Sequence, residues 1–427
     1  MSDRSDLRSR APEGKLAQSD RWRYEDTLHC NRCGFCTSAC PTYLATGDET
    51  LSPRGRNQSL RAYYEGWLKD PADASRAFDT CLQCGACASV CFAEVPTAKL
   101  MGTARRKVAE VHGWPFFQRL VLRFLLPRPR LMEWVIRPLF LMKNLGVARL
   151  LNRLGLLGLV SPALAAAEEI AGRLPIRFPD RTPAPPDAKV VRFVSCGTHY
   201  LVPEAARSTA ALLDRAGVRH GCARTVCCGL PALSLGDWDA ARELARANIS
   251  ALEKFPQAVV LADDSSCAAT LKDYPFLFED DPAWLPRARA VAARVKDVSE
   301  WLADLPAPQS PGAPPVKATY HDPCKARFAQ KLIAAPRKVM KSLPGVEFVE
   351  LPEADQCCGG GGTACFRQPD LSRAVLDRKT ACVVSTGAEV VVTSAGSCLL
   401  QLRFGLKRAK SDVKALHLSH FIAQRYL

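Results

Sequence analysis

The sequence contains no long apolar run and no hydrophobic leader. In its most hydrophobic part, the longest charge-free apolar run covers residues 154–167, has 14 residues and includes glycine and proline. A membrane-spanning helix needs about 20 apolar residues. The first 20 residues are polar and lack the apolar segment of a secretory signal. We therefore expect a cytoplasmic protein that does not cross a membrane.

Histidine is scarce, with 7 residues, whereas cysteine is abundant, with 19. An odd number of cysteines cannot all pair within one chain, and cysteines in a reducing compartment are typical of metal ligation or redox chemistry. The length of 427 residues suggests about three domains. Hydrophobic residues make up 48% and charged residues 24%, which excludes collagen, a disordered tail and a disulfide mini-protein.

The net charge of +15 fits an anionic membrane surface, an acidic partner or nucleic acid. No segment resembles a base-reading motif, so we do not expect nucleic acid as a partner. Two proline-rich stretches, 172–189 and 305–317, are typical of linkers. The predicted segments are a flexible tail (1–26), an α-helical ferredoxin-like domain (27–113), a basic amphipathic helical segment (114–171), and two cysteine-rich blocks, block one (190–304) and block two (316–427).

The two blocks look like an internal repeat. In each block, a β-branched run ends at a lone cysteine, a helix and a strand lead to Cys-Cys-Gly, and another helix and strand end at a further cysteine. Strands that alternate with helices indicate an α/β unit, and ligand groups of such units gather where strands end. We therefore predict an α+β multidomain protein, in which a helical ferredoxin-like domain precedes two duplicated α/β domains with their cysteines at one edge.

The ferredoxin-like segment contains the spacing C-x2-C-x2-C-x3-C twice, in residues 30–40 and 81–91. In two-cluster ferredoxins the fourth cysteine of each run binds the other cluster. Structural zinc is the alternative, but it typically uses two separated cysteine pairs. We predict two [4Fe–4S] clusters, the first held by Cys30, Cys33, Cys36 and Cys91, and the second by Cys40, Cys81, Cys84 and Cys87.

The two blocks contribute a second group of candidate ligands. Cys-Cys-Gly recurs at corresponding places, which packing alone explains poorly; the alternative is a set of buried thiols that behave as small hydrophobic groups. The Gly359–Gly362 run lacks the trailing Gly-Lys-Ser/Thr of a phosphate loop. The candidates are Cys196, Cys227, Cys228 and Cys267 in block one, and Cys324, Cys357, Cys358 and Cys398 in block two.

These motifs carry a resemblance that covers nearly the whole chain from about residue 27. The run CNRCGFCTSACPTYLATGDETLSPRGR, the second ferredoxin run and the paired Cys-Cys-Gly blocks resemble the iron–sulfur subunit of glycolate oxidase, within the group that shares heterodisulfide-reductase-like cysteine-rich domains. The resemblance implies an electron-transfer subunit that takes electrons from a flavoprotein dehydrogenase partner and passes them to quinone or another carrier. It leaves open further iron–sulfur clusters in one or both blocks.

The chain itself has no flavin or nicotinamide fingerprint, so we expect no flavin on it and assign it no catalytic residue. The resemblance also covers the iron–sulfur subunits of lactate and glycerol-3-phosphate dehydrogenases, which remain alternatives. A heterodisulfide or thiol–disulfide reductase is a further alternative. A zinc-stapled scaffold that docks on a partner is the non-redox hypothesis.

The blocks depart from the fullest pattern of this group, in which each block ends in C-x-x-C. Asp264 and Ala395 stand where the first of those cysteines is expected. Each block therefore offers four core cysteines instead of five, which argues against unusual non-cubane clusters and against disulfide cleavage. For Asp264 we expect a solvated loop acid rather than an oxygen ligand.

Several other residues have two interpretations. His321 lies three residues before Cys324 and fits a ligand, a proton donor or a hydrogen-bonded structural histidine equally well. His199 has the same ambiguity, and His417 and His420 are expected to be structural or solvated. Three cysteines lie outside the repeat and are expected to be free or core thiols, although Cys365 could add a ligand: Cys222, Cys365 and Cys382.

The basic segment has an amphipathic pattern. Residues 101–160 contain 11 lysines or arginines and 2 glutamates. This pattern predicts contact with the inner face of the cell membrane or with an acidic partner. The alternative is two ordinary helices that pack on the ferredoxin-like domain. The apolar stripe consists of Phe117, Leu120, Val121, Phe124 and Leu125, followed by Leu131, Trp134, Val135 and Leu139.

Overall fold

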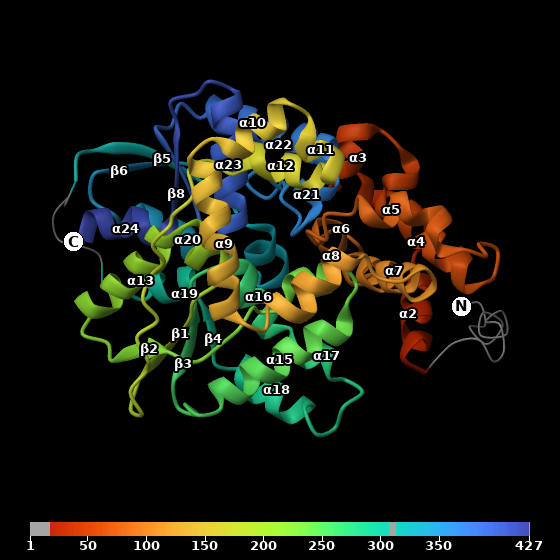
Figure 1. Ribbon diagram of the computed structural model, residues 1–427, viewed down its shortest axis with the longest axis horizontal. Helices are drawn as coiled ribbons and strands as arrows, with labels where there is room; N and C mark the ends of the chain where they lie inside the picture. The colour runs from red at the N-terminus through yellow and green to blue at the C-terminus, as the bar shows by residue number, and fades with distance from the viewer. Residues whose placement is uncertain (1–17, 307–312, 427) are drawn as a thin grey trace.

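The computed structural model describes residues 18–306 and 313–426. The described part of the first 113 residues is helical and contains no strand (Figure 1). The two cysteine runs lie mostly in the short segments between its helices, although Cys87 lies within a helix. The main helices of this domain are α2 (Gln18–Leu28), α3 (Pro41–Thr46), α4 (Pro53–Tyr64), α5 (Ser75–Asp79), α6 (Ala86–Ser89) and α7 (Thr97–His112).

The predicted tail is wrong in its last part. Residues 18–26 belong to helix α2, and the side chains of Arg23 and Tyr24 are buried. The Arg23 guanidinium lies 4.2 Å from the centre of the Phe276 ring in block one. This cation–π contact ties a polar-looking segment to the core, a consequence of tertiary packing that composition does not reveal. Residues 1–17 lie outside the described part.

Block one is a four-stranded parallel sheet covered by helices on both faces. Its strand order is β2-β1-β3-β4, so β1 and β3 occupy the middle. All four residues of β1 are buried, as expected for a strand that is covered on both sides. Its strands are β1 (Val190–Phe193), β2 (His220–Cys222), β3 (Val259–Ala262) and β4 (Val295–Asp297). Its main helices are α13 (Pro203–Arg215), α14 (Leu230–Ser234), α15 (Trp238–Leu252), α16 (Ser265–Lys272), α17 (Tyr274–Leu277), α18 (Leu285–Ala292) and α19 (Val298–Ala303).

Block two repeats this topology, with the strand order β6-β5-β7-β8 and parallel pairing throughout. Within the described residues, the strand order of each sheet reverses between its two central strands, so the connections run toward opposite edges on the two sides of this point. Functional groups of α/β sheets gather at such a point. Its strands are β5 (Val316–Tyr320), β6 (Val346–Val349), β7 (Val390–Thr393) and β8 (Lys414–His417). Its main helices are α20 (Ala334–Ser342), α21 (Ala364–Arg367), α22 (Pro369–Ser385), α23 (Gly396–Arg408) and α24 (Leu418–Tyr426). The structure thus confirms the α+β class with a duplicated α/β unit.

The two blocks share hydrophobic cores. Leu212 of α13 and Leu302 of α19 pack in one buried cluster with Phe421 of α24 and Val392 of β7. Val202, at the start of α13, packs with residues of α22 and α23 in another. Because each core takes side chains from both blocks, the blocks fold against each other as a single unit.

The basic segment forms helices that lie on the near face in Figure 1 and pass across both blocks. Leu122 is buried in the core of block one. Arg123 forms a bidentate ion pair with Asp237, in which both N–O distances are 2.9 Å. The alternative of helices packed on the ferredoxin-like domain is therefore wrong for this first part. These elements are α8 (Phe116–Arg119), the π-helical η4 (Leu120–Leu125), α9 (Pro129–Asn144), α10 (Val147–Arg153), α11 (Leu156–Val160) and α12 (Pro162–Ile170).

The apolar stripe of this segment points to solvent. Phe117 is 73% exposed and Trp134 is 81% exposed, and Phe124 and Leu139 are also exposed. The buried contact comes instead from Leu122, which lies off the stripe. Among the helices of residues 18–306 and 313–426, none combines the length and hydropathy needed to cross a bilayer.

Candidate iron–sulfur centres

The two cysteine runs of the N-terminal domain have the same backbone conformation. Arg32 and Gly34 in the first run have φ angles of 57° and 87°, and Gln83 and Gly85 in the second have 49° and 89°. Left-handed residues on either side of Cys33 and of Cys84 turn the chain sharply, so that each run forms a tight loop. Glycine tolerates this conformation, whereas Arg32 and Gln83 adopt it at a cost.

The predicted first set lies at the surface. Cys33 is exposed and Cys36 is half-buried. Burial, together with smaller effects of the nearby Cys30 and Cys91, raises the pKa of the Cys36 thiol to about 11. The structure therefore brings Cys91, from the second run, next to the first run.

The predicted second set lies deeper. Cys40 is buried and Cys81 is buried. Burial raises the pKa of Cys87, and the neighbouring Cys81 and Cys40 add to this effect. Cys36 of the first set is also close enough to act on Cys87. Cys30 and Cys91 of the first set pack against the buried cluster that contains Cys81, so the two sets lie close together.

Two buried arginines surround the second set, and sequence reasoning missed both. Arg56, on α4, directs Nη1 to the Cys40 Sγ at 3.7 Å and donates Nε–H to the carbonyl of Ala77 at 2.7 Å. It lies within the segment that carries the resemblance, but spacing does not distinguish a buried arginine from an exposed one. In water-excluded surroundings a guanidinium beside cluster sulfurs favours the more negative, reduced state.

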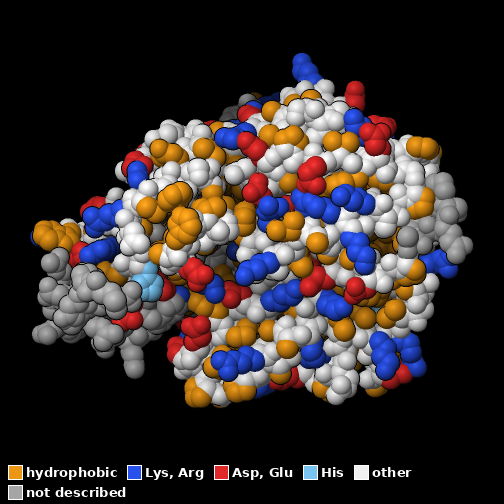
Figure 2. Space-filling model, turned by 180° about the vertical axis from the view of Figure 1, so that it is seen from behind, with side chains coloured by type: hydrophobic (Ala, Val, Ile, Leu, Met, Phe, Trp, Pro, Cys, Tyr) orange, Lys and Arg blue, Asp and Glu red, His pale blue; other side chains and the backbone are white. Residues whose placement is uncertain are grey.

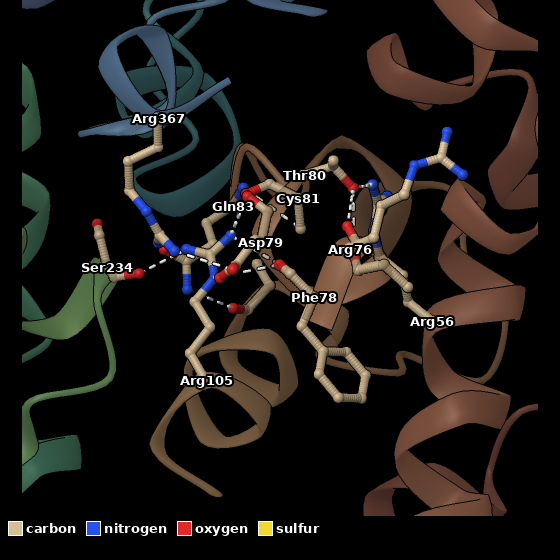
Figure 3. Close-up of polar contacts among 12 residues, drawn as sticks. Arg56, Arg76, Phe78, Asp79, Thr80, Cys81, Gln83, Arg105, Ser234 and Arg367 are labelled. Atoms are coloured by element: carbon tan, nitrogen blue, oxygen red, sulfur yellow. Dashed lines mark hydrogen bonds and ion pairs between the residues drawn. The ribbon is translucent and has the colours of Figure 1, made fainter. Parts of the chain in front are cut away.

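The second arginine, Arg105 on α7, binds a row of backbone carbonyls (Figure 3). It donates to Phe78 at 2.8 Å, to Cys81 at 2.6 Å and to Ser234 of block one at 2.5 Å. Burial lowers the pKa of Arg105. One side chain thus joins the loop of the second cysteine run to block one.

The cysteines of block two gather at the carboxyl edge of its sheet. Cys324 follows β5 and begins a π-helical turn, η6 (Lys325–Ala329), which is typical of functional positions. The Cys357 thiol lies in contact with Cys324 and Cys358, and Cys358 with Cys398 at the start of α23. Contact with Cys324, which donates to it, lowers the pKa of Cys357, but contact with Cys358 and burial outweigh this and raise it.

Glycine is required after the cysteine pair of block two, because a side chain there would clash with the backbone. Gly359 has φ 83°, and a Cβ there would lie 2.5 Å from the backbone oxygen of Ser372. Gly361 and Gly362 permit two further close approaches, since Cβ atoms on them would lie 2.8 Å from Leu82 and 2.9 Å from Ser234. The glycine run therefore lies where block two meets both the N-terminal domain and block one.

Block one repeats the arrangement. Cys196 follows β1 and begins the π-helical η5 (Gly197–Leu201). Cys227 contacts Cys196 and Cys228, and Cys228 contacts Cys267. Gly229 has φ 93°. The repeat proposed from sequence thus has the same local geometry at its cysteine pair in both blocks.

The cysteine sets of block two and of the N-terminal domain adjoin each other. Cys324 and Cys87 raise the pKa of Cys84 in addition to burial, which has the largest effect. A Cβ on Gly85 would lie 3.3 Å from the Cβ of Phe328 in η6. Two segments that are far apart in the sequence therefore meet at their cysteines.

The expectation of a solvated Asp264 is wrong. Its side chain is buried and caps α16, accepting hydrogen bonds from the backbone of Ser266 at 2.8 Å and, more weakly, Cys267 at 3.4 Å. The other oxygen accepts from the backbone N–H of Gly396 in block two at 2.7 Å. Burial raises the pKa of Asp264, and these hydrogen bonds oppose that effect. Asp264 thus joins the two cysteine sites rather than facing water.

The histidines divide into two kinds. His199 is buried, and its Nε2 lies 3.1 Å from Glu133 of α9. Burial lowers its pKa to about 4. His417 is also buried, and burial lowers its pKa to about 4. His321 differs, because it is fully buried and neither ring nitrogen has a hydrogen-bond partner within the described chain.

The chemistry of these sites fits iron–sulfur groups. Burial and neighbouring thiols raise the pKa of Cys84, Cys87 and Cys324, so the thiolate forms that bind metals are unfavourable at these positions without a cation. Contact with Cys227 and Cys267 instead lowers the pKa of Cys228. Bound iron would supply that positive charge. Zinc would also do so, but the paired runs with exchanged fourth cysteines match the arrangement of two cubane clusters.

Comparison with known families defines the class of protein. A 4Fe–4S dicluster domain matches residues 26–95, and the cysteine-rich domain matches residues 190–272 and 318–403. The intervening residues 114–171 match the linker region of the glycolate oxidase iron–sulfur subunit. The chain is therefore an iron–sulfur protein with a dicluster domain and two cysteine-rich domains.

Individual relatives narrow this class. A probable glycolate oxidase iron–sulfur subunit of Bacillus subtilis (strain 168) is 30% identical over 437 residues, covering 98% of this chain and 96% of the relative. The glycolate oxidase iron–sulfur subunit of Escherichia coli (strain K12) is 30% identical, covering 87% and 89%. A lactate utilization protein A of Exiguobacterium is 32% identical over 55% of this chain and 96% of the relative. The chain belongs to the family of glycolate oxidase iron–sulfur subunits.

Proposed function

We propose that this chain relays electrons from a flavoprotein dehydrogenase that oxidises glycolate or a related 2-hydroxy acid to quinone or another carrier. The observation that supports it is a continuous series of cysteine sets. The first set, which includes the exposed Cys33, lies close to the buried set, because Cys30 and Cys91 pack against the cluster that contains Cys81. The buried set lies close to block two, because Cys84 and Cys324 pack against one shared buried cluster. When bound, iron–sulfur clusters pass single electrons between such sites.

The eight cysteines of the N-terminal domain are the proposed ligands of two [4Fe–4S] clusters, and those of the two blocks are the proposed ligands of further centres. The chain's own residues set the surroundings of each site. Cys33 opens to solvent, whereas Arg56 and Arg105 exclude water from the second set and present positive charge to it. This increase in burial and positive charge from the first set to the second favours electron flow from the surface inward.

The surface next to Cys33 is the proposed docking point of the flavoprotein. Phe35 and Phe92 are 59% and 82% exposed, and their rings meet edge to face with centroids 5.2 Å apart. Exposed aromatic pairs are typical of protein interfaces. A partner that covers these rings would bring its flavin close to the exposed set.

We further propose that the complex is cytoplasmic and lies on the inner face of the cell membrane. The exposed apolar stripe that includes Phe117 and Trp134 is accompanied by exposed arginines, among them Arg119 and Arg130. Apolar side chains bordered by positive charge fit an anionic lipid surface. Quinone dissolves in that membrane, so a peripheral position serves the proposed transfer.

The test compares Cys84→Ser with Cys365→Ser, a buried cysteine outside the candidate sets, in the complex purified without oxygen from its own cells. We expect Cys84→Ser to abolish glycolate-dependent quinone reduction while a dye that accepts electrons from the flavin is still reduced. Cys365→Ser should preserve both activities. Unchanged quinone reduction in Cys84→Ser, or a complex without flavin, would contradict the proposal.

Lactate is the second candidate donor, favoured by the relatives named lactate utilization protein A. The substrate pocket would lie on the partner, so this chain's residues do not distinguish the two acids. Assaying the same purified complex with glycolate and with L-lactate separates them. A complex that reduces quinone with lactate alone would replace glycolate in the proposal.

A further inference from the structure

His321 occupies an unusual position in block two. It directly follows β5, and its backbone N–H donates to Val392 of β7 at 2.9 Å. Its side chain is completely buried, and both Nδ1 and Nε2 lack a hydrogen-bond partner in the described residues. Buried polar groups nearly always have partners, so an unpartnered imidazole indicates that something else binds it.

The nearest candidate is the cysteine site itself. A ring nitrogen of His321 and the sulfurs of Cys358 and Cys398 all lie within 4.8 Å of one another. Two further thiols belong to the same group: Cys357 contacts Cys358, and Cys324 contacts Cys357. The imidazole thus lies in the site rather than behind it.

The repeat makes this arrangement specific to block two. The position three residues before the first cysteine is His321 in block two and Phe193 in block one. Neither block has the fifth cysteine of the fullest pattern, because Ala395 and Asp264 take its place. The oxygens of Asp264 are already occupied by backbone N–H groups. His321 therefore gives block two a fifth donor that block one lacks.

We propose that His321 is a nitrogen ligand of the iron centre that Cys324, Cys357, Cys358 and Cys398 would hold. Imidazole nitrogen binds iron readily, and in some iron–sulfur proteins histidine replaces cysteine and raises the reduction potential. The inference rests on the proposed iron–sulfur function of block two. It predicts that the two blocks differ: a mixed nitrogen and sulfur site in block two and sulfur alone in block one.

The test uses the holo-complex from cells supplied with ¹⁵N-histidine, examined by pulsed electron paramagnetic resonance during a redox titration. We expect a ¹⁵N coupling from an imidazole in the wild-type protein that is lost in His321→Cys. The matched control is His199→Cys, which changes a buried histidine near Cys196 and should keep the coupling. A coupling that survives in His321→Cys, or that is lost only in His199→Cys, would overturn the proposal.

Mössbauer spectra of ⁵⁷Fe-enriched protein provide a second measurement that needs no paramagnetic state. We expect His321→Cys to retain the wild-type iron content, since a thiolate replaces the nitrogen, while the spectrum of one iron site changes. His321→Ala should lose iron from that site. Wild-type spectra in both variants would contradict ligation by His321, whereas wild-type protein with no iron in block two would instead contradict the proposed function of that block.

Discussion

Single buried charges determine the surroundings of the second cysteine set. Arg56 is 1% exposed and directs its guanidinium to Cys40, Thr42 and Thr80. Removing a buried arginine changes both the charge and the hydrogen bonds at the sulfur, and these two factors control cluster potentials. We therefore expect Arg56 to position and tune the proposed second cluster rather than to bind it.

We predict that Arg56→Gln lowers the reduction potential of the second cluster by several tens of millivolts, because the reduced state loses a nearby positive charge. A redox titration followed by electron paramagnetic resonance measures it. Arg61→Gln, on the same helix but paired with Glu65, is the control and should leave both potentials in place. An unchanged potential in Arg56→Gln would show that the guanidinium is only structural.

Asp263 provides a pH-dependent contribution to folding stability. It is 2% exposed, and its oxygens accept from the backbone of Ser195 at 2.9 Å and from Thr198 Oγ1 at 2.8 Å. Burial raises its pKa from 3.8 to about 7. Between these values the folded state keeps the proton and the unfolded state loses it, so ionisation favours unfolding as the pH rises.

We predict that the free energy of unfolding falls as the pH rises toward 7, by up to roughly 1.4 kcal/mol per pH unit from this group, and that Asp263→Asn removes this dependence. Thermal unfolding of the holo-protein from about pH 5 to about pH 8 measures it. Asp370→Asn, at an exposed carboxylate, should retain the wild-type profile. Parallel profiles for wild type and Asp263→Asn would count against a raised pKa.

At the scale of elements, the helices of the basic segment (114–171) pack on block one with some side chains and expose others to solvent. Leu122 and Arg123 fix η4 to block one, while the side chains of Phe117, Phe124 and Trp134 remain exposed. The face opposite to that in Figure 1 has basic and acidic side chains interspersed over its centre (Figure 2). The segment therefore carries exposed apolar side chains together with exposed arginines such as Arg119 and Arg130.

We predict that the protein binds vesicles containing phosphatidylglycerol and that the double variant Phe117→Ser/Trp134→Ser weakens binding at least tenfold, since two aromatic side chains no longer enter the lipid interface. Co-sedimentation measures it. Trp67→Ser is the control, because Trp67 is 83% exposed on the N-terminal domain. An equal loss of vesicle binding in the double variant and in Trp67→Ser, or binding that does not depend on lipid charge, would argue for a protein partner at this surface.

At the scale of the whole molecule, polar contacts, of which only that of Arg105 is fully buried, hold the N-terminal domain against both blocks. Arg105 reaches the carbonyl of Ser234, and Asp79 pairs with Arg367 of α21 at 2.9 Å (Figure 3). Lys99 pairs with Asp273 at 2.9 Å. These contacts position Cys84 beside Cys324, which the proposed relay needs.

We predict that Arg105→Met lowers the free energy of unfolding by about 3 kcal/mol or more, because several buried carbonyls lose their donor. Thermal unfolding together with limited proteolysis measures it, and we expect the N-terminal domain to be cleaved first. Arg106→Met removes a surface pair with Glu110 and a cation–π contact with the Trp238 ring at 5.6 Å, and should cost about 1 kcal/mol or less. Comparable stability of the two variants would mean that Arg105 does not join the domains.

The sequence by itself determined the cysteine motifs and the repeat. The spacing of residues 30–40 and 81–91 acts over a few residues, and strand–helix alternation is local, so both can be read from the chain. The α+β class and the family followed from these patterns. Local spacing fixes which side chains a loop brings together, whatever the rest of the fold does.

Only the tertiary structure decided which polar groups are buried and which sites adjoin. The exposure of the Phe117 stripe, the burial of Asp264 and Arg56, and the lack of a hydrogen-bond partner for His321 in the described residues all depend on segments distant in the sequence. The proximity of Cys84 to Cys324 also depends on segments that are distant in the sequence. Whether a charge or an imidazole is desolvated depends on what packs over it, and residue spacing carries no record of that packing.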